Sequence, residues 1–239
     1  MGLPLLSVLP LAGAARVLDL GTGTGALFPT LRSSSPGAVI CGVDNSEGML
    51  RIAQTRGGRC LCVMDAQRLA LRSASFDAVV LMFILFHVPD PLGGLVEAAR
   101  VLRPAGWIGL TTWARDPGLP GVAIWNEELE RVGAGPDPRD PAVMQHERVG
   151  DRQALARLLE EAGFSSTEMW TGSFEHRWDH ESLLSLQLGC GMPRRRLERT
   201  ESEVQQVCVE RVRQRIWELP VEELVWRPEV LFSVAKRLA

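Results

Sequence analysis

Three glycines at alternate positions form the centre of the stretch RVLDLGTGTGAL, residues 16–27. Glycine has no side chain and adopts positive φ angles, so a ligand can closely approach the backbone N–H groups of Gly21, Thr22, Gly23 and Gly25. An apolar strand precedes the glycines and an apolar helix is expected to follow. The pattern predicts a loop that holds a nucleotide-like cofactor, and a tight turn without a ligand also fits it.

Three aspartates stand where expected strands end. Asp44 can accept hydrogen bonds from both hydroxyls of a ribose, as in several classes of nucleotide cofactor. Asp65, followed by Ala66, can accept a hydrogen bond from an adenine amino group while the neighbouring backbone contacts the ring edge. Asp19, just before the glycine loop, suits a cofactor that carries an ammonium group at its other end.

Strands and helices alternate through the first half of the chain. Nearly continuous apolar runs predict strands at 16–20, 38–44, 59–66, 75–86 and 107–114, and helical spacing predicts helices at 25–33, 46–56 and 92–104. Strands of this kind form a parallel sheet that is covered on both faces. Ligands bind such sheets beyond the carboxyl ends of the strands, where the three aspartates stand.

The second half is more irregular. A short helix is expected near 122–132, a longer one at 151–164 with Asp151 as its N-cap, and a strand at 165–174. About 50 residues of helical character follow, in which TESE (200–203) predicts a capping box. The segment 228–238 is expected to close the chain as a strand.

Several motifs in this order resemble the class I S-adenosylmethionine-dependent methyltransferases, especially the small-molecule branch with the ubiquinone and menaquinone C-methyltransferases. The matching pieces are VLDLGTGTG, GVDNSEGML, MDAQRLALRSASFDAVVLMFILFHVPDP, EAARVLRPAGWIGLTTW and LLEEAGF. The resemblance implies an α/β protein with the three-layer αβα Rossmann-like methyltransferase fold. Its mostly parallel seven-stranded sheet would have an antiparallel last strand. We expect a cofactor-binding core over 1–174 with an insertion at 115–150, a helical substrate lid at 175–227, and a final core strand at 228–239.

The resemblance also implies a set of cofactor contacts. The loop Gly21–Gly25 would lie under the methionine portion of S-adenosylmethionine, with Asp19 near its ammonium group. Asp44 would bind the ribose, Asn45 and Met49 would flank the adenine, and Asp65 with Ala66 would contact its edge. Leu81 and Met82 would offer backbone atoms to the methionine end, where relatives often carry a small polar residue and this chain is apolar.

The expected function is transfer of a methyl group from S-adenosylmethionine to an oxygen, nitrogen or carbon atom of a small metabolite, releasing S-adenosylhomocysteine. One alternative is a non-catalytic regulator or partner subunit that binds the same cofactor, which the short N-terminal segment and the apolar MFIL stretch favour. Another is an NAD(P)-dependent oxidoreductase, because GTGTGA also fits the dinucleotide pattern through Ala26.

Catalytic candidates are few. Methyl transfer from a sulfonium depends mainly on positioning, and a base is needed only when the acceptor loses a proton. His87, in LFHVPD, and His146, before the 151–164 helix, are the candidates, and His87 also suits a structural hydrogen-bonded role. The chain lacks the motifs of adenine-amino, cytosine-C5 and ribose-2′-O methyltransferases, and no acidic metal cluster follows the fourth strand. A small-molecule acceptor remains.

The composition fits this assignment. The chain has 239 residues, 46% of them hydrophobic, and a net charge of −3, so neither nucleic acid nor a membrane is an expected partner. Five cysteines without metal-ligand spacing predict buried thiols in a protein of the reducing cytoplasm. Because only a short segment precedes the first strand, we expect segments 115–150 and 175–227 to cover the site. The alternatives are an open site or one that a second subunit completes in a homodimer. Tryptophans in the second half fit either an aromatic acceptor pocket or packing, and PRRR (193–196) fits either a solvated turn or an anion contact.

Overall fold

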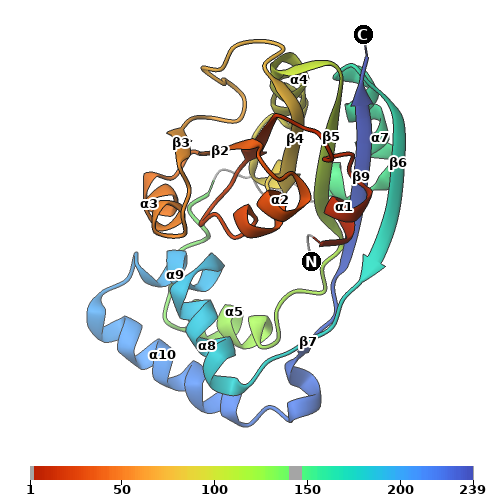
Figure 1. The fold of residues 1–239 in the computed structure, drawn as a ribbon. Coiled ribbons are helices and arrows are strands. Elements are labelled where there is room, and N and C mark those ends of the chain that lie inside the picture. The colour runs from red at the N-terminus through yellow and green to blue at the C-terminus, as the bar shows by residue number, and fades with distance from the viewer. Residues whose placement is uncertain (1–2, 140–146, 239) are drawn as a thin grey trace. The chain divides into compact units, whose positions relative to one another are not determined.

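The computed structural model describes residues 3–139 and 147–238 (Figure 1). The chain divides into two compact units, which are described here one at a time. The sheet unit contains Met1–Arg115, Pro141–Gly172 and Glu229–Ala239. The helical unit contains Asp116–Asp140 and Ser173–Pro228.

A seven-stranded sheet with the order β3-β2-β1-β4-β5-β9-β6 organises the sheet unit. Its strands are β1 (Arg16–Leu20), β2 (Val39–Asp44), β3 (Cys60–Val63), β4 (Phe76–Met82), β5 (Leu102–Arg115), β6 (Phe164–Ser173) and β9 (Glu229–Arg237). The first five pair in parallel, and β9 runs antiparallel to β5. The expected mostly parallel sheet with an antiparallel last strand is therefore confirmed.

Helices cover both faces of this sheet (Figure 1). One face carries α1 (Leu3–Val8), α2 (Phe28–Ser34) and α3 (Glu47–Thr55), and the other carries α4 (Pro91–Val101), α6 (Glu147–Gly150) and α7 (Arg152–Glu161). The larger apolar core lies on the second side, where Leu81 of β4, Leu95 of α4 and Leu155 of α7 are buried together. Burying both faces explains why the parallel strands are apolar along their whole length.

Element boundaries follow local chemistry, with two corrections. As expected, Asp151 accepts a hydrogen bond from the Ala154 N–H at 2.8 Å and caps α7. The predicted capping box at 200–203 is wrong, because the Thr200 hydroxyl donates to the Leu197 carbonyl instead. The helix expected to reach Pro104 ends at Val101, and β5 begins at the next residue.

The helical unit has its own core. It contains α5 (Val122–Arg131), α8 (His180–Gly189), α9 (Gly191–Leu197), α10 (Ser202–Trp217), the 3-10 helix η3 (Val221–Leu224) and the short strands β7 (His176–Arg177) and β8 (Val225–Trp226). Trp125 is fully buried there, and its indole N–H donates to Gln187 Oε1 at 2.8 Å. A buried indole needs such a partner, so this tryptophan serves packing.

The PRRR arginines are held inside the helical unit. Arg195 donates twice to the carboxylate of Asp137, at 3.1 and 2.8 Å, and Arg196 donates to the carbonyls of Gly135 and Ala134. Hydrogen bonds from Arg195 and Arg139 outweigh burial and lower the pKa of Asp137. These contacts fasten α9 to the loop after α5, so Arg195 and Arg196 have structural partners, whereas Arg194 is exposed and pairs with Glu198 at 2.6 Å.

The cysteines are all free thiols. Only Cys208 is fully buried, while Cys41, Cys60 and Cys62 are half-buried and Cys190 is exposed. The expectation of buried thiols was therefore too broad. Cys60 and Cys62 lie on β3, an edge strand that covers its side chains only in part, and Cys190 lies at the exposed end of α8. No helix in the described ranges is long and apolar enough to cross a membrane.

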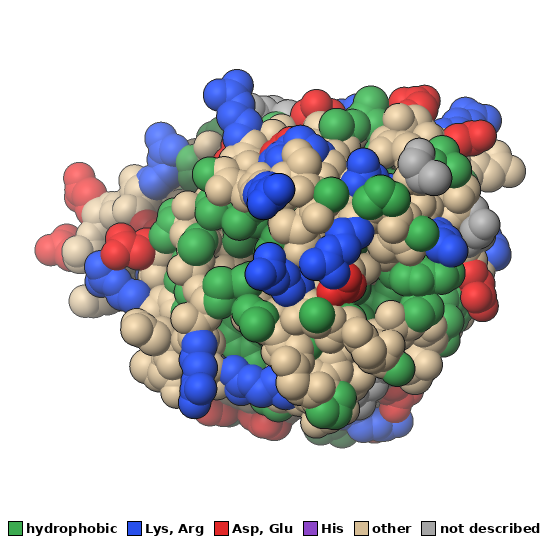
Figure 2. All heavy atoms as spheres, turned by 45° about the horizontal axis from the view of Figure 1, so that its top comes forward, with side chains coloured by type: hydrophobic (Ala, Val, Ile, Leu, Met, Phe, Trp, Pro, Cys, Tyr) green, Lys and Arg blue, Asp and Glu red, His purple; other side chains and the backbone are tan. Residues whose placement is uncertain are grey.

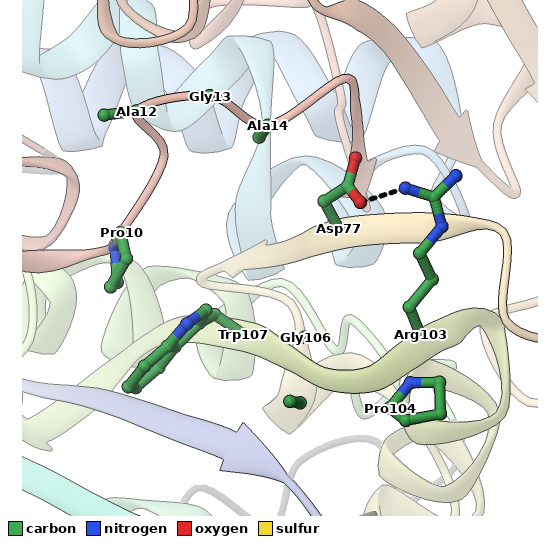
Figure 3. A pocket seen from close by; sticks show the side chains of 10 residues that line it. Pro10, Ala12, Gly13, Ala14, Asp77, Arg103, Pro104, Gly106 and Trp107 are labelled. Carbon is green, nitrogen blue, oxygen red and sulfur yellow. Dashed lines mark hydrogen bonds and ion pairs between the residues drawn. The ribbon is translucent and has the colours of Figure 1, made fainter.

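The edge of the sheet at which the parallel strands begin comes forward in Figure 2, where basic side chains are scattered among hydrophobic ones. A hollow of about 260 Å³ lies at this edge, lined by the loop before β1 and the start of β5 (Figure 3). On one side of it the carboxylate of Asp77 points at Arg103. The same carboxylate accepts hydrogen bonds from the Ala15 and Arg16 N–H groups, at 2.8 and 2.9 Å. This contact holds the start of β1 against β4.

Replacing Asp77 with asparagine should lower the free energy of unfolding by about 1–3 kcal/mol, because one amide oxygen cannot accept both N–H groups and the guanidinium. Burial alone would raise the pKa of Asp77, but these N–H groups and Arg103 together lower it. The stabilisation is therefore present above the unfolded pKa of about 3.9 and is lost as the pH falls through the lower folded value. Urea unfolding at pH 7 and pH 3 measures both effects, and Asp90→Asn is the control. Equal stabilities of Asp77→Asn and wild type at pH 7 would contradict this account.

Candidate active site

The glycine loop connects β1 to α2 at the carboxyl edge of the sheet. The N–H groups of Gly21 and Thr22 both donate to the Val43 carbonyl, at 2.7 and 2.9 Å, which ties the loop to the end of β2. Gly21 and Gly23 have φ angles of 76° and 53°, in the left-handed region that favours glycine. A Cβ on Gly21 would lie 2.2 Å from Ile84 Cγ2, whereas one on Gly23 would meet nothing within 4 Å. The backbone at Gly23 therefore borders open space that a ligand can fill.

Asp19 is buried beneath this loop, only 2% exposed. Its Oδ2 accepts a hydrogen bond from the Thr22 hydroxyl at 2.6 Å. Burial raises its pKa to about 6, and the charge of Asp44 adds to that rise while the Thr22 bond opposes it. At neutral pH the carboxylate is ionised in a poorly solvated position, which a cationic group would stabilise.

Asp44 joins the glycine loop to α3. Its Oδ2 accepts a hydrogen bond from the Gly23 N–H at 2.9 Å, and its Oδ1 accepts one from the Ser46 N–H at 2.8 Å. Ser46 in turn caps α3, with its hydroxyl accepting from the Met49 N–H at 3.3 Å. An ionised carboxylate has about four acceptor positions, so capacity remains for ribose hydroxyls.

Asp65 lies at the end of the next strand and is exposed. The Met64 N–H donates to the Asp44 carbonyl at 3.0 Å, which sets the third strand end beside the second. Asp65 Oδ1 accepts from the Gln67 N–H at 2.9 Å and from Gln67 Nε2 at 3.2 Å. Gln67 Oε1 accepts from the Asp90 N–H at 3.0 Å, so this glutamine links the β3 end to the start of α4.

Gln67 was not predicted as a site residue. The turn after Asp65, in which a carboxylate accepts from the N–H two residues on, is a common local pattern that could have signalled part of its role. Its long-range bond to the Asp90 backbone has no signal in one sequence. We therefore treat Gln67 as a positioning residue for Asp65.

Replacing Gln67 with leucine should weaken S-adenosylmethionine binding by about threefold to tenfold, because Asp65 loses its side-chain donor while its bond to the residue-67 N–H remains. Calorimetric titration measures the dissociation constant. Gln67→Glu serves as the matched control, since it keeps the length but places a second carboxylate against Asp65 and should weaken binding further. An unchanged dissociation constant in both variants would remove Gln67 from the site.

The remaining expected cofactor residues lie around this edge. Asn45 and Met49 are exposed at the start of α3, and Ala66 is half-buried beside Asp65. Leu81 is buried in the core, and Met82 is half-buried with its sulfur 3.8 Å from the Thr111 hydroxyl. Asp19 pairs in register with Val80, so the β4 end lies directly beside the glycine loop.

The segment after β4 is shaped by apolar contacts. Ile84 fills the space over Gly21, and Phe83 has a positive φ of 58°, which is rare for a bulky residue. The 3-10 helix η1 (Leu85–His87) follows, with the ring centre of His87 4.4 Å from that of Phe86. His87 is exposed at the same edge as the glycine loop. His146 lies outside the described residues.

The described residues hold no cluster of three or more histidine, cysteine, aspartate or glutamate side chains arranged to bind a metal ion. The site is therefore built from one buried carboxylate, two further carboxylates at adjacent strand ends and an open glycine loop, with apolar residues after β4. This donor set fits a cofactor with an ammonium group, a ribose and a base.

Comparison with known proteins agrees with this arrangement. Residues 18–110 match a family model described as a methyltransferase domain. The chain is 30% identical over 168 residues to the ubiquinone biosynthesis O-methyltransferase of Thiobacillus denitrificans, covering 67% of this chain and 68% of that protein. It is 33% identical over 175 residues to the demethylmenaquinone methyltransferase of Clavibacter sepedonicus, covering 68% and 70%. The structure of the YcgJ protein from Bacillus subtilis aligns with a TM-score of 0.64 at 16% identity, over 100% of this chain and 97% of that one. The chain belongs to the class I S-adenosylmethionine-dependent methyltransferases.

Proposed function

We propose that this methyltransferase acts on the ring of a quinone-type metabolite in its reduced, electron-rich form. The observation that carries the proposal is the apolar end of β4, where Met82, Phe83 and Ile84 are half-buried at the edge that carries the glycine loop. An acceptor with a flat, mostly apolar ring suits such a surface. The names of the two curated relatives, which concern ubiquinone biosynthesis and demethylmenaquinone, support the same class of acceptor.

The cofactor residues take the roles that their positions suit. Bound S-adenosylmethionine supplies an electrophilic methyl group on its sulfonium. Asp19 holds the ammonium group, because a buried carboxylate is stabilised by a cation. Asp44 accepts the ribose hydroxyls. The loop Gly21–Gly25 borders the methionine portion, with the backbone of Leu81 and Met82 beyond it.

The adenine would lie between the second and third strand ends. Asp65 accepts a hydrogen bond from its amino group, and the backbone at Ala66 contacts its edge. Asn45 and Met49, exposed at the start of α3, flank the ring. Gln67 keeps the Asp65 carboxylate oriented for this contact.

Proton removal depends on the acceptor. A quinol that is methylated on oxygen or carbon loses a proton, so a base increases the rate. His87 is the described candidate, since it is exposed at the correct edge of the sheet and histidine titrates near neutral pH. His146 remains a second candidate from the sequence alone.

The helical unit is proposed to bind and cover the acceptor. It is a compact body with its own buried cluster, including Trp125, Leu184 and Val212.

Five free thiols support a location in the reducing cytoplasm. A homodimer stays a prediction, and size-exclusion chromatography with light scattering would test it.

Methyl transfer tests the acceptor class directly. The purified chain is incubated with methyl-labelled S-adenosylmethionine and, separately, demethylmenaquinol, a substituted catechol, a primary amine and a carboxylic acid. We expect label in the demethylmenaquinol or catechol product, with equal release of S-adenosylhomocysteine. Label in the amine or acid alone would refute the quinone-type acceptor and leave the family assignment unchanged.

A further inference from the structure

The strand order separates a cofactor half from an acceptor half of the carboxyl edge. Asp65, Asp44 and Asp19 stand at the ends of β3, β2 and β1, which are consecutive in the sheet. The next two strands in that order are β4 and β5, on the side to which the methionine end of the cofactor is assigned. An acceptor that approaches the methyl group therefore meets the ends of β4 and β5.

Two aromatic side chains pair at these ends. The ring centres of Phe83, after β4, and Trp113, near the end of β5, lie 4.4 Å apart with the ring planes tilted by 34°. Both residues pack against the apolar core of the sheet unit and are half-buried, not fully enclosed. Half-buried aromatic rings offer large, rigid surfaces against which another planar ring can stack.

The position of Phe83 is set by an unusual backbone conformation. Its φ of 58° lies in the left-handed region, which is unfavourable in a residue other than glycine. The Phe83 N–H donates to the Thr111 carbonyl at 3.1 Å, and Ile84 packs onto Gly21 on the other side. Contacts on both flanks thus hold the strained residue, and such strain is concentrated at functional sites.

Neither residues 81–86, at the end of β4, nor residues 110–114 of β5 carry a charged side chain. Residues 81–86 are all apolar, and 110–114 read LTTWA, in which the threonine hydroxyls and the indole N–H are the polar side-chain groups. The Thr111 hydroxyl is already directed at the Met82 sulfur, 3.8 Å away. An acceptor that is recognised here is therefore recognised by its flat apolar surface and not by charge.

We propose that Phe83 and Trp113 form the stacking platform for the acceptor ring and make the enzyme prefer planar aromatic acceptors over saturated ones of equal size. This inference rests on the proposed function for the direction of methyl transfer, but its test measures binding and needs no turnover.

The test compares two bicyclic alcohols with the same carbon skeleton, one planar and aromatic and the other saturated. Binding of 2-naphthol and of decahydro-2-naphthol to the full chain is measured by calorimetry in the presence of saturating S-adenosylhomocysteine. Stacking should make wild type bind the planar probe about tenfold more tightly. The variants Phe83→Leu and Trp113→Leu should lower that preference to about twofold or less and leave S-adenosylhomocysteine affinity within twofold of wild type.

Matched variants separate stacking from folding. Trp107→Leu replaces a half-buried tryptophan on the same strand at the opposite edge, where the Lys236 ammonium lies 5.5 Å from its ring centre, and should keep the preference. The conservative variant Trp113→Phe, which keeps an aromatic ring, should retain most of the preference for the planar probe. If Trp113→Leu does not fold, judged by thermal melting, Phe83→Leu and Trp113→Phe still decide the question.

The outcomes are distinct. Equal binding of the two probes by wild type, or a full preference retained in both leucine variants, would overturn the inference. A preference that depends on Phe83 and Trp113, together with no methyl transfer to any quinol, would support the platform and refute the proposed acceptor class.

Discussion

Replacing Asp19 with asparagine is expected to weaken S-adenosylmethionine binding by about a hundredfold. The ammonium group of the cofactor would lose a buried charge partner that contributes about 3 kcal/mol to the binding free energy. The same change should make the free protein more stable at pH 7. Burial raises the Asp19 pKa from 3.8 to about 6, so the folded protein binds this proton more tightly than the unfolded chain. Because a tenfold change in proton affinity corresponds to about 1.4 kcal/mol, the ionised group destabilises the free protein by about 3 kcal/mol.

The pH dependence follows with a defined sign. A group whose folded pKa is raised favours folding when it is protonated, so the contribution of Asp19 to the stability of the free wild type should fall as the pH rises from about 4 to about 6. Cofactor affinity should change in the opposite sense and decrease below about pH 6, because protonated Asp19 cannot pair with an ammonium group. In Asp19→Asn the part of each profile that is due to Asp19 should be absent, while other carboxyls such as Asp77 continue to contribute.

Calorimetric titration and urea unfolding between pH 4 and 8 measure both quantities. Asp44→Asn is the matched control. It removes a carboxylate of the same site and should weaken binding, but Asp19 still titrates in this variant. Because the Asp44 charge raises the Asp19 pKa, the midpoint of the Asp19 titration should be lower than in wild type. An Asp19→Asn variant that binds S-adenosylmethionine as tightly as wild type at pH 7.5 would rule out the proposed role.

Residues that repeat a local pattern were predictable from the sequence. The alternation of apolar strands with helices predicted the parallel sheet, because a strand buried on both faces must be apolar along its whole length. The carboxyl ends of such strands meet at one edge, so Asp44 and Asp65 could be assigned to neighbouring positions from their places in the chain. The glycine loop followed from the need for a backbone without side chains between a strand and a helix.

Features that arise from long-range contacts were not predictable. Gln67 acts through the Asp90 N–H, 23 residues along the chain, and nothing near it in the sequence indicates that bond. The positive φ of Phe83 depends on its bond to β5 and on the packing of Ile84 against Gly21. The capping box failed for a different reason, because the Thr200 hydroxyl bonds to the carbonyl three residues before it, a local alternative to capping the next helix.

The glycines of the loop look equivalent in the sequence but should respond very differently to substitution. Gly21→Ala should destabilise the protein by about 2–5 kcal/mol, through left-handed strain and overpacking. Its Cβ would lie 2.2 Å from Ile84 Cγ2, a side chain held by the strained segment after β4. Gly23→Ala meets no atom within 4 Å, so it should cost only about 1 kcal/mol of stability. Its methyl group instead occupies the space assigned to the cofactor, which should weaken S-adenosylmethionine binding about tenfold to a hundredfold.

Gly13→Ala is the control for backbone strain. Gly13 has a φ of 81° and open space around its Cα, as Gly23 does, but it lies in the loop before β1 at the opposite edge of the sheet (Figure 3). It should lose stability like Gly23→Ala and bind the cofactor like wild type. Thermal melting and calorimetric titration of the three variants therefore separate packing, strain and ligand contact within one series. Equal cofactor affinities in Gly13→Ala and Gly23→Ala would mean that the cofactor does not lie against the loop at Gly23, since both substitutions place a Cβ in open space at a positive φ.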